Sequence, residues 1–141
     1  MDATMGLDEY HQWRNGRLVD PDATVEERNR GMLAHLLGML GLLDHFLFGL
    51  VGTVVLYAIT KGRSAFADDH AREAINFQLS LLIYEFAGGM LVLFTLGLGA
   101  LVVVPALFAL WILRLVTGIQ ASMAATRGEH YRYPMCMRFL A

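Results

Sequence analysis

Residues 74–113 read AINFQLSLLIYEFAGGMLVLFTLGLGALVVVPALFALWIL, and Glu85 is the only charged side chain among them. A helix that crosses a hydrocarbon core about 30 Å thick needs roughly 20 apolar residues. The stretch is long enough for two crossings, and Leu96-Gly97-Leu98-Gly99 interrupts it. It therefore predicts two membrane-spanning helices, over residues 68–96 and 100–126, with the first beginning near Asp68.

A second apolar run covers residues 31–60, with the ionisable pair Asp44 and His45 near its middle. As one helix the run would be about 45 Å long at 1.5 Å per residue, which exceeds the membrane thickness. A break at the ionisable pair predicts helices over residues 24–43 and 46–61. Each is short for a full crossing, so a re-entrant hairpin that enters the membrane and returns is an alternative.

The positive charges predict which side of the membrane each loop occupies. Ten of the 11 Lys and Arg residues form three groups, and Arg114 is the remaining one. The groups are Arg14, Arg17, Arg28 and Arg30; Lys61, Arg63 and Arg72; and Arg127, Arg132 and Arg138. Because Lys and Arg near membrane spans favour the cytoplasmic side, both termini and the central loop are predicted to be cytoplasmic. Two full hairpins satisfy this pattern, and so does a re-entrant first hairpin.

The composition excludes several classes of protein. With 56% hydrophobic residues and a mean hydropathy of +0.48, the 141-residue chain is more apolar than ordinary soluble domains. A net charge of -2 argues against nucleic-acid binding. One cysteine, Cys136, excludes an internal disulfide, and the start of the chain lacks the apolar core of a cleaved signal peptide.

Three domains are predicted from these patterns. Residues 1–23 form a polar extension, flexible or loosely docked. Residues 24–127 form an all-α membrane domain, whose first helix begins with a capping box between Thr24 and Glu27. Residues 128–141 form an extended tail on the cytoplasmic membrane face. Its candidate interfacial residues are Tyr131, Arg132, Tyr133 and Pro134, because tyrosine and arginine favour the headgroup region.

Polar residues gather at the start of the third predicted helix and form the first candidate site. Its members are His70, Glu73, Asn76, Gln78 and Tyr84. Most of them share one helical stripe, which indicates either a partner-binding rim or groups that cap the helix and fix the fold. His70 and Glu73 have the spacing of two metal ligands, but two ligands do not make a site, and no metal is predicted.

Glu85 and Arg114 are the second candidate site, because ionisable residues inside a membrane are costly and face protein or water. Arg114 can extend toward the cytoplasmic surface, which would leave Glu85 protonated or paired elsewhere. If the helices tilt, the two side chains can instead pair directly. His35, in the first apolar run, is interpreted as a hydrogen-bonded packing residue rather than a ligand.

Several stretches resemble a known family. They are Glu27-Arg28-Asn29, Met32 to Leu36, Phe66 to Tyr84 and Gly128 to Pro134. Over about residues 26–139 the chain resembles small bacterial membrane proteins of unassigned function, related to the Tic-type channel subunit of the chloroplast inner-envelope translocon. The resemblance implies a four-helix membrane protein and a distant analogy to a channel.

The leading functional prediction is a non-enzymatic, multi-pass protein of the bacterial inner membrane, an accessory or scaffold subunit of a larger assembly. Its expected partners are the lipid bilayer and either other membrane proteins or further copies of itself, without nucleic acid or cofactor. The alternatives are an oligomeric channel, implied by the resemblance, and an intramembrane metal-dependent enzyme. Serine-hydrolase, zinc-protease and phosphate-loop motifs are missing from the sequence.

Overall fold

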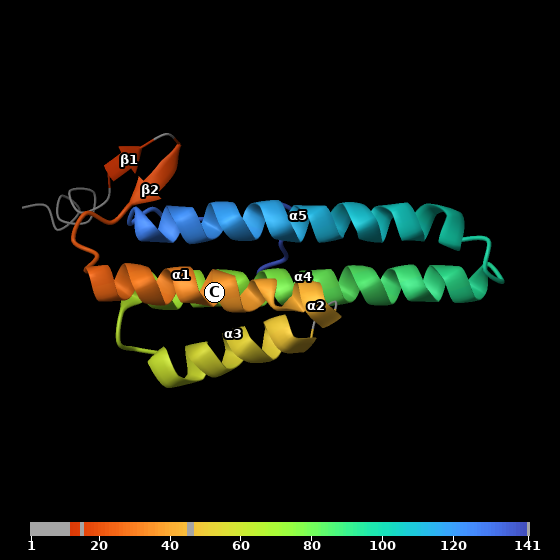
Figure 1. Ribbon diagram of the computed structural model, residues 1–141, viewed down its shortest axis with the longest axis horizontal. Helices are drawn as coiled ribbons and strands as arrows, with labels where there is room; N and C mark the ends of the chain where they lie inside the picture. Colours follow the sequence, from red (N-terminus) through yellow and green to blue (C-terminus); the bar gives the residue numbers. More distant parts are fainter. Residues whose placement is uncertain (1–11, 15, 45–46, 141) are drawn as a thin grey trace, which may run out of the picture.

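The computed structural model describes residues 12–14, 16–44 and 47–140 and is mostly helical, as predicted (Figure 1). The elements are the strands β1 (Gln12–Arg14) and β2 (Arg17–Val19) and the helices α1 (Val25–Met39), α2 (Gly41–Asp44), α3 (Leu47–Thr60), α4 (Ala65–Phe94) and α5 (Ala100–Thr126). His45, half of the predicted break, and most of the N-terminal extension lie outside the described residues.

The helices α4 and α5 form a long antiparallel pair, and both are long and apolar enough to cross a membrane. At 1.5 Å per residue they measure about 45 and 40 Å. The turn between them has Gly97 at φ +94°, a conformation that a residue without Cβ adopts at little cost. The Thr95 hydroxyl accepts a hydrogen bond from the Gly99 amide at 2.7 Å. The side of the membrane on which this turn lies stays a prediction.

Polar side chains set where α1 and α4 begin. The Thr24 hydroxyl accepts from the Glu27 amide at 3.3 Å, and the Glu27 carboxylate accepts from the Thr24 amide at 2.7 Å, which confirms the capping box. Helix α4 begins at Ala65, before the predicted start near Asp68, because the Ser64 hydroxyl already caps the amide of Ala67.

The shorter helices α1 and α3 form an antiparallel hairpin beside only one half of the α4–α5 pair (Figure 1). They measure about 22 and 21 Å at 1.5 Å per residue. Two hydrogen bonds mark how far the hairpin reaches. The Gln78 amide donates to the carbonyl of Gly38 at 2.9 Å, and Arg114 donates to the carbonyl of Gly41 at 2.6 Å. Among the described residues, α4 and α5 continue beyond this level as a pair of helices alone.

The hairpin is held by close backbone contact between α1 and α3. A Cβ atom added at Gly49 would lie 2.5 Å from the carbonyl oxygen of Gly38 and 2.9 Å from the amide nitrogen of Gly41. A side chain at position 49 would therefore push the helices apart. Small residues permit such close packing inside membranes.

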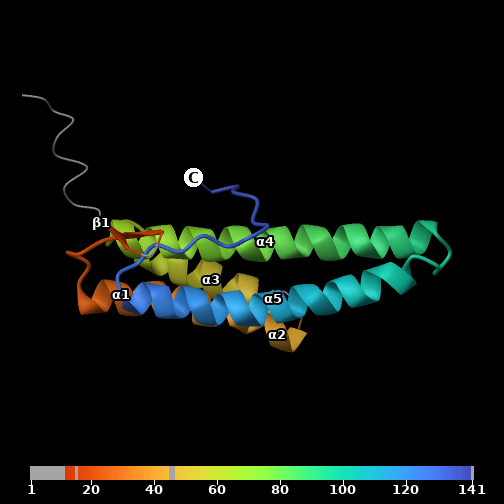
Figure 2. The ribbon, with the colours of Figure 1, turned by 90° about the horizontal axis from the view of Figure 1, so that it is seen from above.

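The residues that precede α1 in the sequence meet those that follow α5, at the end of the molecule where α1 begins and α5 ends. The amide of Asp20 donates to the carbonyl of Gly128, and the amide of His130 donates to the carbonyl of Leu18, both at 2.8 Å. From there the tail crosses to α4 (Figure 2). The segment that ends the N-terminal extension is therefore tied to the start of the tail by backbone hydrogen bonds.

Candidate functional site

A buried row of aromatic and imidazole rings joins α1, α4 and the tail. His35 lies between two hydrogen-bond partners, the His70 Nδ1 atom at 2.7 Å and the Tyr133 hydroxyl at 3.0 Å. His70 in turn stacks on His130, whose Nδ1 atom lies 2.7 Å from the Asp69 carboxylate. His35 and His70 are fully buried. His35 is therefore hydrogen-bonded within the core, as the sequence predicted.

The polar stripe on α4 binds the tail of the same chain. The Asn76 side chain accepts from the amides of Phe139 and Leu140 at 3.0 and 2.8 Å and donates to the carbonyl of Leu140 at 2.9 Å. Ser80 accepts from the amide of Met137 at 2.8 Å. The Asn76 side chain thus supplies both a hydrogen-bond donor and an acceptor to the backbone of the extended tail, as the backbone of a neighbouring β-strand would.

Glu73 and Tyr84 complete this tail clamp, which we define as Glu73, Asn76, Ser80 and Tyr84. Glu73 accepts from the amide of Tyr133 at 2.8 Å, and Tyr84 donates to the carbonyl of Met135 at 2.7 Å. The predicted stripe therefore exists, but Glu73 and Asn76 face the tail and are buried. Their positions match the interpretation as fold-fixing groups more closely than that of an open binding rim.

The tail tyrosines differ in position from the sequence-based expectation. Tyr131 and Tyr133 are buried within the protein rather than exposed on its surface, and the Tyr133 ring stacks on Phe77 with 4.0 Å between centroids. Burial raises the pKa of Tyr133 well above its usual value. Pro134 is exposed, and the chain reverses beside it, with Met135 at φ +55°. The tail therefore runs along α4 from Glu73 to Tyr84 and then turns back toward Asn76.

Ion pairs hold the exposed side of the tail. Arg132 contacts the Asp69 carboxylate at 2.8 Å, and Arg138 lies 3.4 Å from Glu73. At the start of the tail, Glu129 pairs with Arg127 at 2.8 Å and with Arg17 at 3.2 Å. The hydrogen bond from Arg127 and, to a smaller extent, the one from Arg17 lower the pKa of Glu129.

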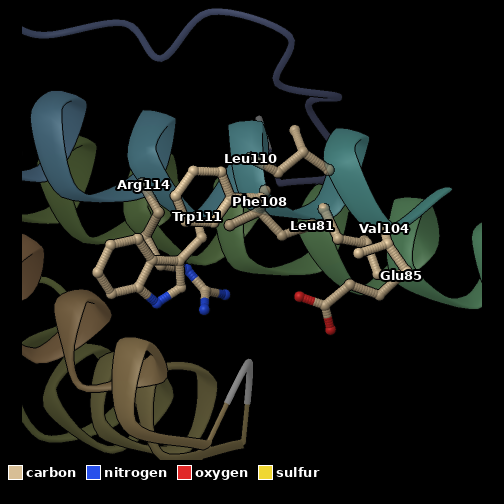
Figure 3. A pocket seen from close by; sticks show the side chains of 8 residues that line it. Leu81, Glu85, Val104, Phe108, Leu110, Trp111 and Arg114 are labelled. Atoms are coloured by element: carbon tan, nitrogen blue, oxygen red, sulfur yellow. The ribbon is translucent and has the colours of Figure 1, made fainter. Parts of the chain in front are cut away.

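The second candidate site surrounds a cavity of about 360 Å³ between α4 and α5 (Figure 3). Apolar side chains form most of its wall, among them Leu81, Phe108 and Trp111. Glu85 and Arg114 line the same cavity, and in Figure 3 the carboxylate and the guanidinium project toward a common space. The structure therefore brings to one cavity the two ionisable side chains that the sequence singled out as candidate intramembrane charges.

The Arg114 side chain is directed into the protein. It is 3% exposed and donates to the carbonyl of Gly41 at 2.6 Å and to the Gln78 side chain at 2.9 Å. Gln78 joins this cluster by donating to Gly38, so Arg114 and Gln78 tie the end of the α1–α3 hairpin to the spanning pair. Sequence reasoning placed Gln78 in the polar rim and missed this role, because its partners, the carbonyl of Gly38 and the guanidinium of Arg114, are about 40 positions away in the chain.

Comparison with known proteins places these features in a family. The magnetosome magnetite crystal formation protein family matches residues 26–140, which include the helices α1 to α5, apart from Val25, and the tail. The chain belongs to this family. No curated protein and no solved structure matches the chain.

Membership of the magnetosome magnetite crystal formation family corrects the resemblance drawn from the sequence. The match is to this family and not to the Tic-type proteins, so the Tic relationship is wrong. The stretches that suggested it, Phe66 to Tyr84 and Gly128 to Pro134, fall within the matched region. In the structure they meet as the tail clamp and the tail, so they reflect a packing arrangement and carry no evidence of a channel.

Within the described residues of this magnetosome-family protein, no group of three or more His, Cys, Asp or Glu side chains is placed to hold a metal ion. His70 and Glu73, the two potential ligands, point to different partners. His70 contacts His35, and Glu73 contacts the tail. The geometry gives these side chains roles in packing.

Proposed function

We propose that this protein is a non-enzymatic accessory subunit of the magnetosome membrane and contributes to the formation of magnetite crystals. The observation that carries the proposal is the family match, which extends over the membrane domain and the tail. Two long apolar helices support a position in a membrane. The polar residues of α4 support a non-enzymatic role, because their hydrogen bonds are directed to the chain itself.

The same geometry supports one form of the accessory role. The tail clamp is covered, so partners would contact the outer helix faces or the exposed residues of the tail. The apolar outer faces of α3 and α5 suit lipid or other membrane proteins. The channel alternative depended on the Tic resemblance and is withdrawn with it. The positions of His70 and Glu73, which are hydrogen-bonded to His35 and to the tail, do not support the metal-dependent enzyme.

Gene deletion in the bacterium that encodes the protein tests the proposal. Electron microscopy of the deletion strain should show magnetite crystals changed in size or number, and the intact gene should restore them. The tagged protein should copurify with membranes that surround magnetite. Unchanged crystals in the deletion strain, or a protein absent from those membranes, would contradict the proposed role.

A further inference from the structure

The molecule has different cross-sections at its two ends. At the end where α1 begins, the helices α1, α3, α4 and α5 lie together, whereas in the part of the chain that the structure describes the other end consists of α4 and α5 (Figures 1 and 2). The change occurs at the level of Gln78 and Trp111, which donate to the carbonyls of Gly38 and Leu42. Each helix is about 10 Å wide, so the hairpin adds about 160 Å² to one end of the molecule.

Part of the exposed apolar surface, from Leu33 on α1 to Phe94 on α4, matches the thickness of a bilayer along this axis. From Gln78 to Phe94, α4 rises about 24 Å, and from Gly38 back to Leu33, α1 extends about 8 Å the other way. Leu33 and Phe94 are both exposed. Together these segments give an apolar length close to the 30 Å of a hydrocarbon core.

The hairpin covers only part of that length. Its outer face is apolar and exposed, through Leu33, Leu36, Leu40, Leu43, Leu47, Phe48, Val51, Val54, Val55 and Ile59. From Leu33 to Leu43 the chain rises at most about 15 Å, and from Leu47 to Ile59 it rises about 18 Å, so each arm covers about half of the core. The hairpin is therefore the right length to lie in one leaflet. This geometry favours the re-entrant alternative over a full crossing.

We propose that the protein is a one-leaflet wedge that binds preferentially to curved bilayers, with its four-helix end on the convex face. The hairpin expands the leaflet that contains it, while the opposite leaflet holds only the two spanning helices. A bilayer relieves this imbalance by curving toward the expanded leaflet, and inserted amphipathic structures are sensitive to curvature for this reason. The inference rests on the membrane position in the proposed function, but it does not require a role in magnetite formation.

The depth of the hairpin is the first test. In a Cys136→Ser background, an environment-sensitive dye is placed at Leu43→Cys or Leu96→Cys, and the full chain is reconstituted in vesicles of phosphatidylcholine and phosphatidylglycerol. Lipid quenchers at the bilayer centre should quench the dye at position 43 more strongly, and headgroup quenchers the dye at position 96. If both dyes report an interface, the hairpin crosses the bilayer and the wedge is refuted.

Curvature preference is the second test. The dye-labelled chain is reconstituted in the same lipids over a tenfold range of vesicle diameter, and protein density per membrane area is measured for molecules whose four-helix end faces outward. Density should rise several-fold from the largest to the smallest vesicles. Equal density in vesicles where the chain is fully inserted would overturn the wedge and leave the magnetosome role untouched.

A pair of charge substitutions provides the matched control. Phe48 is exposed on the hairpin near its inserted end, whereas Val25 is exposed at the polar start of α1. Phe48→Lys should withdraw the hairpin and abolish the curvature preference while α4 and α5 stay inserted. Val25→Lys should retain it. Equal curvature preference in the two inserted variants would contradict the proposal.

Discussion

Asn76 makes the largest set of direct contacts between α4 and the end of the tail, so its loss should release the tail. Asn76→Ala removes three hydrogen bonds, to the amides of Phe139 and Leu140 and the carbonyl of Leu140. Each such bond contributes about 0.5–1.5 kcal/mol net. Because Phe139 and Leu140 are exposed and water can replace part of the loss, we expect a total of about 1–2 kcal/mol. The population of released tail should then rise about 5–30-fold.

The reactivity of Cys136 reports this release. In the docked tail, burial raises the pKa of the Cys136 thiol to about 11, with a smaller contribution from the charge of Glu73. Only the thiolate reacts with alkylating reagents. A fully released thiol with the ordinary pKa of 9.0 would hold about a hundredfold more thiolate near neutral pH. Alkylation of the Asn76→Ala protein should therefore be faster than that of the wild type, by up to about 5–30 times when the thiol reacts through the released tail, below this hundredfold ceiling.

The assay measures alkylation rate in detergent micelles, alongside helical content by circular dichroism. Asn29→Ala, at an exposed position on α1, is the matched control and should leave the rate unchanged. Denatured protein gives the rate of the fully accessible thiol. If Asn76→Ala reacts at the wild-type rate while its helices are intact, the tail is not held by this side chain and the tail clamp is misassigned.

Three further predictions follow from the site and the hairpin. Arg114→Leu leaves the Gln78 side chain and a backbone carbonyl without their buried donor, and should lower the free energy of unfolding by about 3 kcal/mol, measured by denaturation in micelles, with Arg114→Lys intermediate. The folded pKa of Glu129 is below its unfolded value of 4.5, so its ion pairs should stabilise the protein above pH 4.5 and lose that contribution as the pH falls further. Glu129→Gln should remove this part of the acid dependence of the melting temperature. Gly49→Ala should separate α1 from α3 and lower the melting temperature, whereas Gly89→Ala, where an added Cβ meets nothing within 4 Å, should not.

The spanning pair could be predicted from sequence because the membrane imposes its own length scale. Residues 74–113 contain one charge and one glycine-rich interruption, and the resulting helices α4 and α5 follow directly. The capping box at Thr24 could also be predicted from the sequence, because it depends on two residues that are only three positions apart. Local patterns and hydrophobic length therefore determined these elements.

The tail could not be predicted in the same way, because its partners are up to 65 positions away in the chain. Alternating residues around Tyr133 indicated an extended segment, and an extended segment can lie on a membrane or in a protein groove. The tail lies against the protein because the side chains of Asn76 and Glu73 accept hydrogen bonds from its backbone amides, in place of a neighbouring β-strand. Nothing in the spacing of these residues identifies the tail as their ligand.

Gln78 shows that the tail and the hairpin are both attached to the same turn of α4. Gln78 lies between Asn76 and Ser80 in the sequence, but on a helix it points away from the tail and toward Gly38 and Arg114. One turn of α4 therefore anchors the tail on one side and the end of the hairpin on the other. A substitution that rotates or unwinds this turn should disturb both at once. Faster Cys136 alkylation should then accompany a deeper or shallower position of Leu43, whereas Asn76→Ala alone should leave the hairpin depth unchanged.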